Sequence, residues 1–244
     1  KAAVKANQEF VPPYGSGGSL YIRPFMVGTE PVVGVTASST YTFHIYATPV
    51  GAYIKDLKPM PYVVSEYDRA AHAGTGQAKT AGNYAASLLA GKKAHDAGYA
   101  GELYLDPREH KYIDEFSGAN FFGIGKDGKF YTPKSESILP SITKKSMLTI
   151  AKDLGLDPTE THIDINDLDQ FTEAGAMGTA AVVSPVGSLT YKGNKHVFFS
   201  ETKPGPVTQK LYDTLFGIQE GDVEDKYGWL SLIHISEPTR PEPI

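Results

Sequence analysis

The chain has 244 residues, of which 41% are hydrophobic and 21% are charged, an ordinary globular composition with enough apolar material for a sizeable core. The net charge of -5 comes from scattered residues of both signs, which excludes the dense positive patch that nucleic acids and anionic membranes require. Cysteine is absent, so disulfides, thiolate nucleophiles and cysteine-bound zinc are excluded as well.

The first third of the chain contains two strand patterns. Runs rich in β-branched and aromatic residues predict strands over Ser19–Met26 and Thr40–Tyr46. Two prolines make residues 55–61 the expected interdomain linker. Because the chain opens on Lys1 rather than Met, in what resembles the end of a helix, we expect a truncated sequence.

A helix is expected after the linker, over Asn83–Ala97. Asn83 is its predicted N-cap, and three apolar residues recur at helical spacing, namely Leu88, Leu89 and Ala94.

The following segment predicts short strands and then two helices. The strands are expected over Leu103–Leu105, Lys111–Glu115 and Asn120–Ile124. A proline at or just before the first residue predicts helices over Ser141–Leu154 and Pro206–Phe216. Mixed strands with few helices indicate an α+β fold.

The end of the chain, residues 231–244, has no clear periodicity. Its proline-rich sequence is typical of translated vector or adaptor sequence, and the alternative is a genuine flexible tail. Residues 62–230 are then the large domain. No apolar run is long enough to span a bilayer and no signal peptide is recognisable, so we expect a cytoplasmic protein with a small-molecule partner and no membrane or nucleic-acid partner.

Lys79 is the most unusual residue of the chain, because it is the only charged residue between Ala73 and Gly91. A lysine held away from water has a depressed pKa, and an unprotonated amine is a nucleophile. Lys79 is therefore a candidate nucleophile. The alternative is a lysine whose side chain extends into solvent from a glycine-rich loop.

The sequence from Glu115 to Lys144 decides between these interpretations. Glu115-Phe116-Ser117-Gly118-Ala119-Asn120-Phe121-Phe122, Thr132 and Leu139-Pro140-Ser141-Ile142-Thr143-Lys144 together resemble the motif of class-IV aminotransferases. Lys79-Thr80-Ala81-Gly82-Asn83-Tyr84 resembles the lysine segment of that family, and the sequences from Tyr14 to Pro24 and from Met177 to Pro185 resemble its branched-chain amino-acid aminotransferases. The resemblance covers residues 1 to about 230 and implies that residues 1–54 are the remnant of a small N-terminal domain that is mostly missing.

The resemblance implies the D-amino-acid-transaminase-like fold, fold type IV, and pyridoxal 5'-phosphate as the cofactor. Lys79 would carry this cofactor and catalyse the reaction, while Glu115 would hold the proton on its ring nitrogen. Tyr84 would bind its phenolic oxygen. The cofactor phosphate would lie at the helix start, beside Ile142 and Thr143, and at the turn formed by Gly178 and Thr179.

The resemblance also implies a substrate site. Thr179 and Ala180 would lie near the substrate carboxylate. Tyr21 and Arg23 share one face of a strand, and an arginine suits the distal carboxylate of glutamate. Without the resemblance, a cross-strand ion pair would be the better interpretation of Arg23.

The implied activity is transfer of the amino group of Leu, Ile or Val to 2-oxoglutarate, which yields glutamate and a branched 2-oxo acid, in an enzyme that is usually a homodimer. Three alternatives stay open: a D-amino-acid transaminase, an aminodeoxychorismate lyase, or a catalytically inactive fragment. The last is weighed because family members carry a phosphate-binding arginine ahead of the position of Lys1, and no matching residue is found here.

Two other signals are discarded. Gly123-Ile124-Gly125-Lys126-Asp127-Gly128 fits a dinucleotide-binding pattern, but residues 126–129 are typical of a hairpin turn and no helix follows them. The seven histidines show no metal-ligand spacing, so we expect no protein-bound metal.

Overall fold

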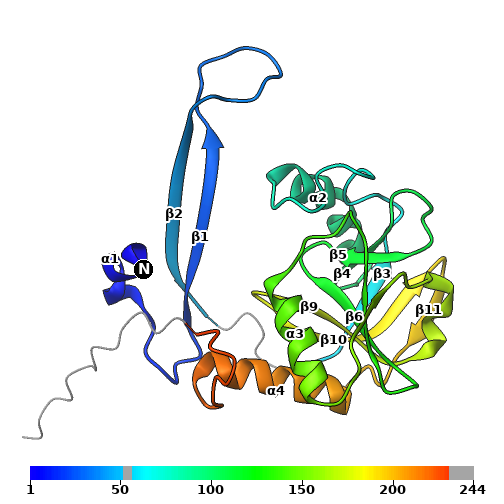
Figure 1. Cartoon of the computed structure of the whole chain (residues 1–244). Helices are drawn as coiled ribbons and strands as arrows, with labels where there is room; N and C mark the ends of the chain where they lie inside the picture. The colour runs from blue at the N-terminus through cyan, green and yellow to red at the C-terminus, as the bar shows by residue number, and fades with distance from the viewer. Residues whose placement is uncertain (52–56, 231–244) are drawn as a thin grey trace, which may run out of the picture. The chain divides into compact units, whose positions relative to one another are not determined.

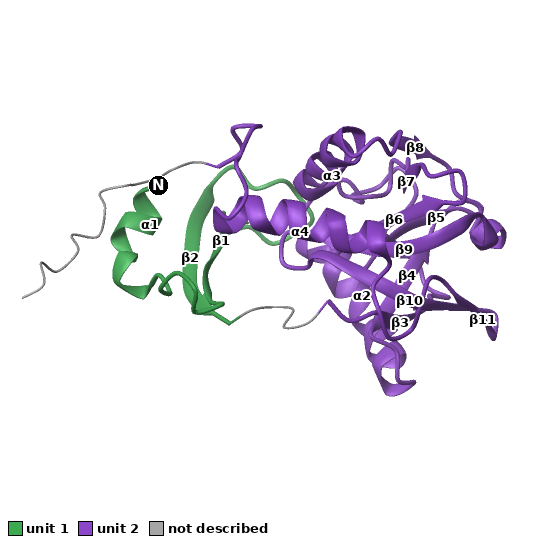
Figure 2. Ribbon diagram, turned by 90° about the horizontal axis from the view of Figure 1, so that it is seen from below, with its two compact units in different colours: residues 1–55, 231–244 green, residues 56–230 purple. Residues whose placement is uncertain are grey.

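The computed structural model describes residues 1–51 and 57–230 of the chain. They belong to two compact units: unit 1 contains the residues up to 55, and unit 2 contains residues 56–230 (Figure 2). The first part of the expected linker and the whole expected tail, residues 231–244, lie outside the described residues.

Unit 1 is a long β-hairpin preceded by two short helices. Strands β1 (Ser19–Gly28) and β2 (Tyr41–Val50) pair antiparallel along their whole length, from Ser19 opposite Val50 to Gly28 opposite Tyr41. The helices are α1 (Ala2–Ala6) and a 3₁₀ turn (Gln8–Phe10). Both predicted strands are confirmed, and each extends beyond its predicted end. None of residues 1–51 is fully buried.

Unit 2 is organised around one nine-stranded sheet (Figure 1). Its strands are β3 (Met60–Val64), β4 (Gly101–Leu105), β5 (Ile113–Phe116), β6 (Asn120–Gly125), β7 (Phe130–Pro133), β8 (Thr159–Thr161), β9 (Phe171–Gly178), β10 (Val182–Tyr191) and β11 (Asn194–Val197). Pairing runs in the order β3-β4-β5-β6-β9-β10 and returns from β10 to β3, so these strands form a closed ring. The α+β class is confirmed.

The helices of unit 2 are α2 (Ala81–Asp96), α3 (Ile142–Asp153) and α4 (Pro206–Glu220), with a 3₁₀ helix over Ile165–Gln170. Helices α3 and α4 pack on each other and on β9, whereas α2 packs on β4. The helix predictions are confirmed, although α4 continues one turn past Phe216 to a left-handed Gly221. No helix among the described residues combines the length and the apolar character that crossing a membrane would need.

Two adjacent phenylalanines on β6 show how the core is divided. Phe121 packs in the cluster that contains Leu103 and Phe171, while Phe122 packs in the cluster that contains Met147 of α3 and Leu211 of α4. Successive residues of a strand point to opposite faces, so β6 supplies one ring to each cluster. Both clusters are built around the sheet that carries Glu115.

The start of α2 differs from the prediction. Thr80, not Asn83, is the N-cap, and the buried Asn83 amide instead donates to the carbonyls of Thr75 and Ala78 in the preceding loop. Leu88 and Leu89 are exposed, since small side chains form the buried face of this helix, namely those of Ser87, Ala90 and Ala94 along with Asn83.

The expected linker also needs a correction at its end. Met60 and Pro61 are already part of β3, which pairs in parallel with β4 and β10. A proline near the start of a strand removes one ladder donor without ending the pairing, so proline did not mark a loop here.

Candidate active site

Lys79 lies in the loop between β3 and α2, one residue before the N-cap of that helix. Its Nζ donates to the phenol oxygen of Tyr84 over 2.9 Å and lies 5.2 Å from the centre of the Tyr84 ring. The side chain is exposed, so the expectation that Lys79 is withdrawn from water is wrong for the chain by itself. The Asn83 contacts described above hold the loop that presents it.

Glu115 is the opposite case, a carboxylate that is only 4% exposed at the end of β5. Its Oε1 accepts from the Leu139 amide over 3.0 Å and lies 2.8 Å from Nη2 of Arg69, and its Oε2 accepts from the Asn120 amide group over 2.8 Å. Burial raises the pKa of Glu115 to about 7, and the Arg69 charge and the Leu139 hydrogen bond oppose that rise.

The start of α3 is linked to Glu115 through Leu139. The Leu139 amide binds Glu115, and the Leu139 carbonyl accepts from Asn120 over 3.2 Å. Two residues later, Ser141 caps α3 by accepting from the Lys144 amide. The first amides of a helix have no partner within it, which leaves those of Ile142 and Thr143 pointing out of the helix end.

The turn at Gly178, Thr179 and Ala180 joins β9 to β10, as predicted for a tight turn between strands. Met177 pairs with Asn120 of β6, and a Cβ added to Gly178 would lie 3.4 Å from the carbonyl oxygen of Gly118. The turn therefore lies beside the β5–β6 turn that follows Glu115. Val182 closes it with a φ of +52°, a strained value for a β-branched residue.

Tyr21 and Arg23 lie in β1 of unit 1. Nη2 of Arg23 donates to the phenol oxygen of Tyr21 over 2.9 Å, so the prediction that they share one face is confirmed. The other predicted site residues all belong to unit 2.

Arg69 was missed by the sequence analysis. Only 6% exposed, it pairs with Glu115 and donates to the carbonyls of Gly76 and Ser137. Its sequence signal was weak, because its partners lie far along the chain and no motif includes it. The neighbouring Asp68, paired with His110, gave no clearer signal.

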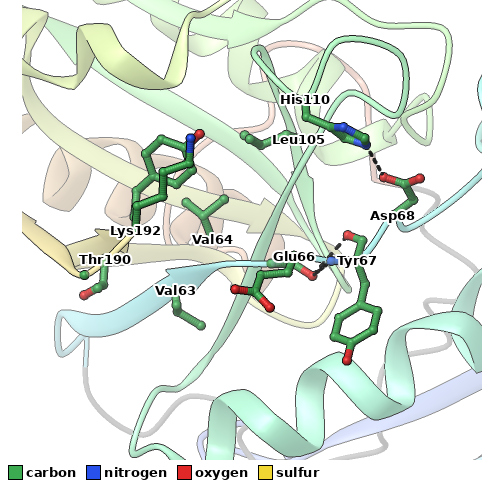
Figure 3. Close-up of a pocket in the computed structure, with 12 residues that line it drawn as sticks. Val63, Val64, Glu66, Tyr67, Asp68, Leu105, His110, Thr190 and Lys192 are labelled. Carbon is green, nitrogen blue, oxygen red and sulfur yellow. Dashed lines mark hydrogen bonds and ion pairs between the residues drawn. The ribbon is translucent and has the colours of Figure 1, made fainter.

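A cavity of about 310 Å³ is lined in part by Asp68, the neighbour of Arg69 in the chain (Figure 3). None of the predicted site residues lines it. It opens between the ends of β3, β4 and β10, and its lining includes Val64, Asp68, His110 and Lys192. Among the residues that the structure describes, no three histidine, aspartate or glutamate side chains are grouped as metal ligands.

Known proteins share much of this sequence. The chain is 53% identical to the branched-chain-amino-acid aminotransferase of Haemophilus influenzae over 237 residues, which cover 94% of this chain and 69% of that protein.

Solved structures agree with this similarity. The Escherichia coli branched-chain amino acid aminotransferase superposes with a TM-score of 0.75 at 33% identity, covering 87% of this chain and 70% of that one. The branched-chain amino acid aminotransferase of Thermoproteus uzoniensis, solved with norvaline, gives 0.74 at 31% identity, covering 87% and 68%. The expected fold type is confirmed. Residues 1–189 match the family described as amino-transferase class IV, and the chain belongs to that family.

Proposed function

We propose that this chain is a pyridoxal-phosphate-dependent branched-chain amino-acid aminotransferase, cytoplasmic and homodimeric, that transfers the amino group of Leu, Ile or Val to 2-oxoglutarate. The names of the matched relatives favour these substrates over those of D-amino-acid transaminases and aminodeoxychorismate lyases. The observation that carries the proposal is the series of contacts that joins the Lys79 loop, Glu115 and the start of α3 through Arg69 and Leu139.

The polar groups of unit 2 fit the cofactor. A buried carboxylate at Glu115 matches a protonated ring nitrogen, a primary amine hydrogen-bonded to a phenol matches the aldehyde end, and the first amides of a helix match a phosphate. When bound, pyridoxal phosphate supplies an electron-withdrawing ring that stabilises negative charge on the substrate α-carbon.

Each residue then has a defined task. The ionised Glu115 carboxylate keeps a proton on the ring nitrogen. The Lys79 amine, once free, would take the α-proton of the amino acid as a general base and deliver it, as a general acid, to the cofactor carbon that carried the aldehyde. Tyr84 orients that amine through the 2.9 Å hydrogen bond. The amides of Ile142 and Thr143, together with Gly178 and Thr179, bind the phosphate.

Two separate groups of residues are proposed to bind the substrate. The Ala180 amide, beside Thr179, binds the α-carboxylate that every substrate carries. Arg23, with Tyr21 beside it, binds the distal carboxylate of glutamate, which leucine lacks. Arg23 would then contribute to the binding of glutamate and not to that of leucine.

The test is the visible absorbance of the purified chain mixed with pyridoxal phosphate, before and after addition of leucine. We expect a yellow band that leucine bleaches, because the amino group passes to the cofactor. Lys79→Ala should lack the band. The matched control is Lys92→Ala, which removes an exposed lysine of α2 paired with Asp96 and should behave as the unmodified chain.

Other results would contradict the proposal. A band that D-alanine bleaches and leucine leaves unchanged would identify a D-amino-acid enzyme. The absence of a band would indicate an inactive fragment. Equal bands in both lysine variants would show that Lys79 does not bind the cofactor.

A further inference from the structure

Arg69 is a buried cation for which the proposed reaction has so far no use. Buried charges are costly unless they are paired and hydrogen-bonded, so a residue of this kind is retained for what it binds. Its Nη2 lies 2.8 Å from Oε1 of Glu115 and donates to the carbonyl of Gly76 over 2.9 Å and to that of Ser137.

These three partners come from three different segments. Gly76 precedes Lys79 by three residues, Glu115 lies in β5, and Ser137 precedes the cap of α3 by four residues. The backbones of Gly76 and Ser137 touch, since a Cβ on Gly76 would overlap the Ser137 carbonyl group. Arg69 therefore binds two loops at the point where they meet, and it binds the carboxylate beside them.

The charges around Glu115 make Arg69 its main cation. Asp114 raises the pKa of Glu115, while Arg69 and Lys144 lower it, with Arg69 the larger of the two. Lys144 forms an ion pair with Glu160 over 2.7 Å, so the positive charge of Lys144 is already balanced by another carboxylate. Without Arg69, the carboxylate would keep hydrogen bonds from Leu139 and Asn120 but would lose its strongest positive neighbour.

We propose that Arg69 is a positioning residue for this reaction: it compensates the charge of Glu115 and fixes the Lys79 loop against the segment that leads into α3. The inference rests on the proposed function, because it assigns Arg69 to the same site. All three contacts use Nη2, at the end of the guanidinium group, so lysine would replace the charge but would have to place its Nζ at that position from a side chain of different shape.

The first experiment uses the chain without cofactor, so that its outcome does not depend on activity. Melting temperatures are measured for Arg69→Met, Glu115→Gln and the double variant, with Arg108→Met, an exposed arginine, as the control. Arg69→Met should melt well below the control, and Glu115→Gln should remove a large part of that loss, since no unpaired carboxylate then remains buried. An equal loss in both backgrounds would overturn the charge pairing.

The second experiment follows the pH dependence of leucine turnover. In Arg69→Gln the acid limb should move upward by about one pH unit or more, because Glu115 loses its main cation. Arg69→Lys should restore the limb while leaving cofactor binding weaker than in the unmodified chain. An unmoved limb in Arg69→Gln would refute the inference.

The two proposals fail in different ways. If the unmodified chain does not turn over leucine, the proposed function is wrong. The melting experiment still tests the charge pairing between Arg69 and Glu115. If the Arg69→Met single variant does not fold, a folded double variant counts for the pairing, and an unfolded double variant counts against it.

Discussion

The Glu115 carboxylate has lost nearly all contact with water, and its charge depends on the few protein groups around it. Desolvation favours the protonated form, and Arg69, Leu139 and Asn120 favour the ionised form. The resulting pKa of about 7 lies close to physiological pH. A second positive neighbour on the cofactor ring would move the balance further toward the ionised form.

This balance predicts how stability changes with pH. The pKa of Glu115 is about 7 in the folded chain against 4.5 for the ordinary carboxyl, so the folded state binds more protons between these values. Its contribution to the free energy of unfolding should therefore fall by up to about 3 kcal/mol as pH rises through that window. Urea unfolding of the cofactor-free chain at a series of pH values measures this fall.

Glu115→Gln should lack the fall, whereas the exposed Glu109→Gln should retain it. A Glu115→Gln chain with the same pH profile as the unmodified protein would show that Glu115 ionises normally when buried.

At the scale of the element, Glu173 ties β9 to the start of α4. Its carboxylate is 4% exposed and accepts from the amides of Val207 and Thr208, over 3.1 and 2.8 Å, and from the Thr208 hydroxyl over 2.7 Å. Gly205 lies so close that a Cβ there would overlap this carboxylate. An acid at the positive end of a helix is favourable, and this one caps α4 from another element.

Glu173→Gln should lower the free energy of unfolding by about 1 to 3 kcal/mol, because the amide cannot accept from all three donors. Glu220→Gln is the matched control at the other end of α4. It removes a negative charge from the helix C-terminus and should leave stability unchanged or raise it by a few tenths of a kcal/mol. Chemical denaturation measures both, and equal effects would mean that the cap carries no special weight.

The elements also show what the sequence could predict. Proline at or just before the helix start predicted the helices that became α3 and α4, and the motif from Glu115 to Lys144 led to the fold type. The predicted N-cap of α2 was wrong because the Asn83 side chain donates to the carbonyls of Thr75 and Ala78. Local helix propensity does not reveal such contacts.

Arg69 could not be predicted for a related reason. Its role depends on Ser137, 68 residues away, and on the close approach of that residue to Gly76. Such contacts exist only once the loops have met, so spacing within a motif carries no trace of them.

At the scale of the whole molecule, the proposed roles are divided between the two units. Lys79, Glu115 and the phosphate-binding groups belong to unit 2, and Tyr21 and Arg23 belong to the hairpin of unit 1. We expect unit 2 to perform the chemistry and unit 1 to distinguish the two kinds of substrate.

Arg23→Ala should therefore reduce kcat/KM for glutamate by roughly tenfold or more, the cost of losing one charge-assisted hydrogen bond, while leucine loses far less. Steady-state kinetics in both directions measure the ratio. Tyr21→Phe keeps the ring but removes the hydroxyl that accepts from Arg23, and it should give a smaller change in the same direction. Equal losses for glutamate and leucine in Arg23→Ala would exclude selective binding of the distal carboxylate.

The closed ring of unit 2 has a consequence for how the protein is made. Strand β3 pairs with β10, as at Val63 and Thr190, so the ring joins segments separated by most of the unit. While the nascent chain leaves the ribosome, β3 and β6 must wait for Phe171–Tyr191 with unpaired edges, which are templates for aggregation. Both edges can pair, and the ring can close, only after the segment up to Tyr191 has emerged from the ribosome.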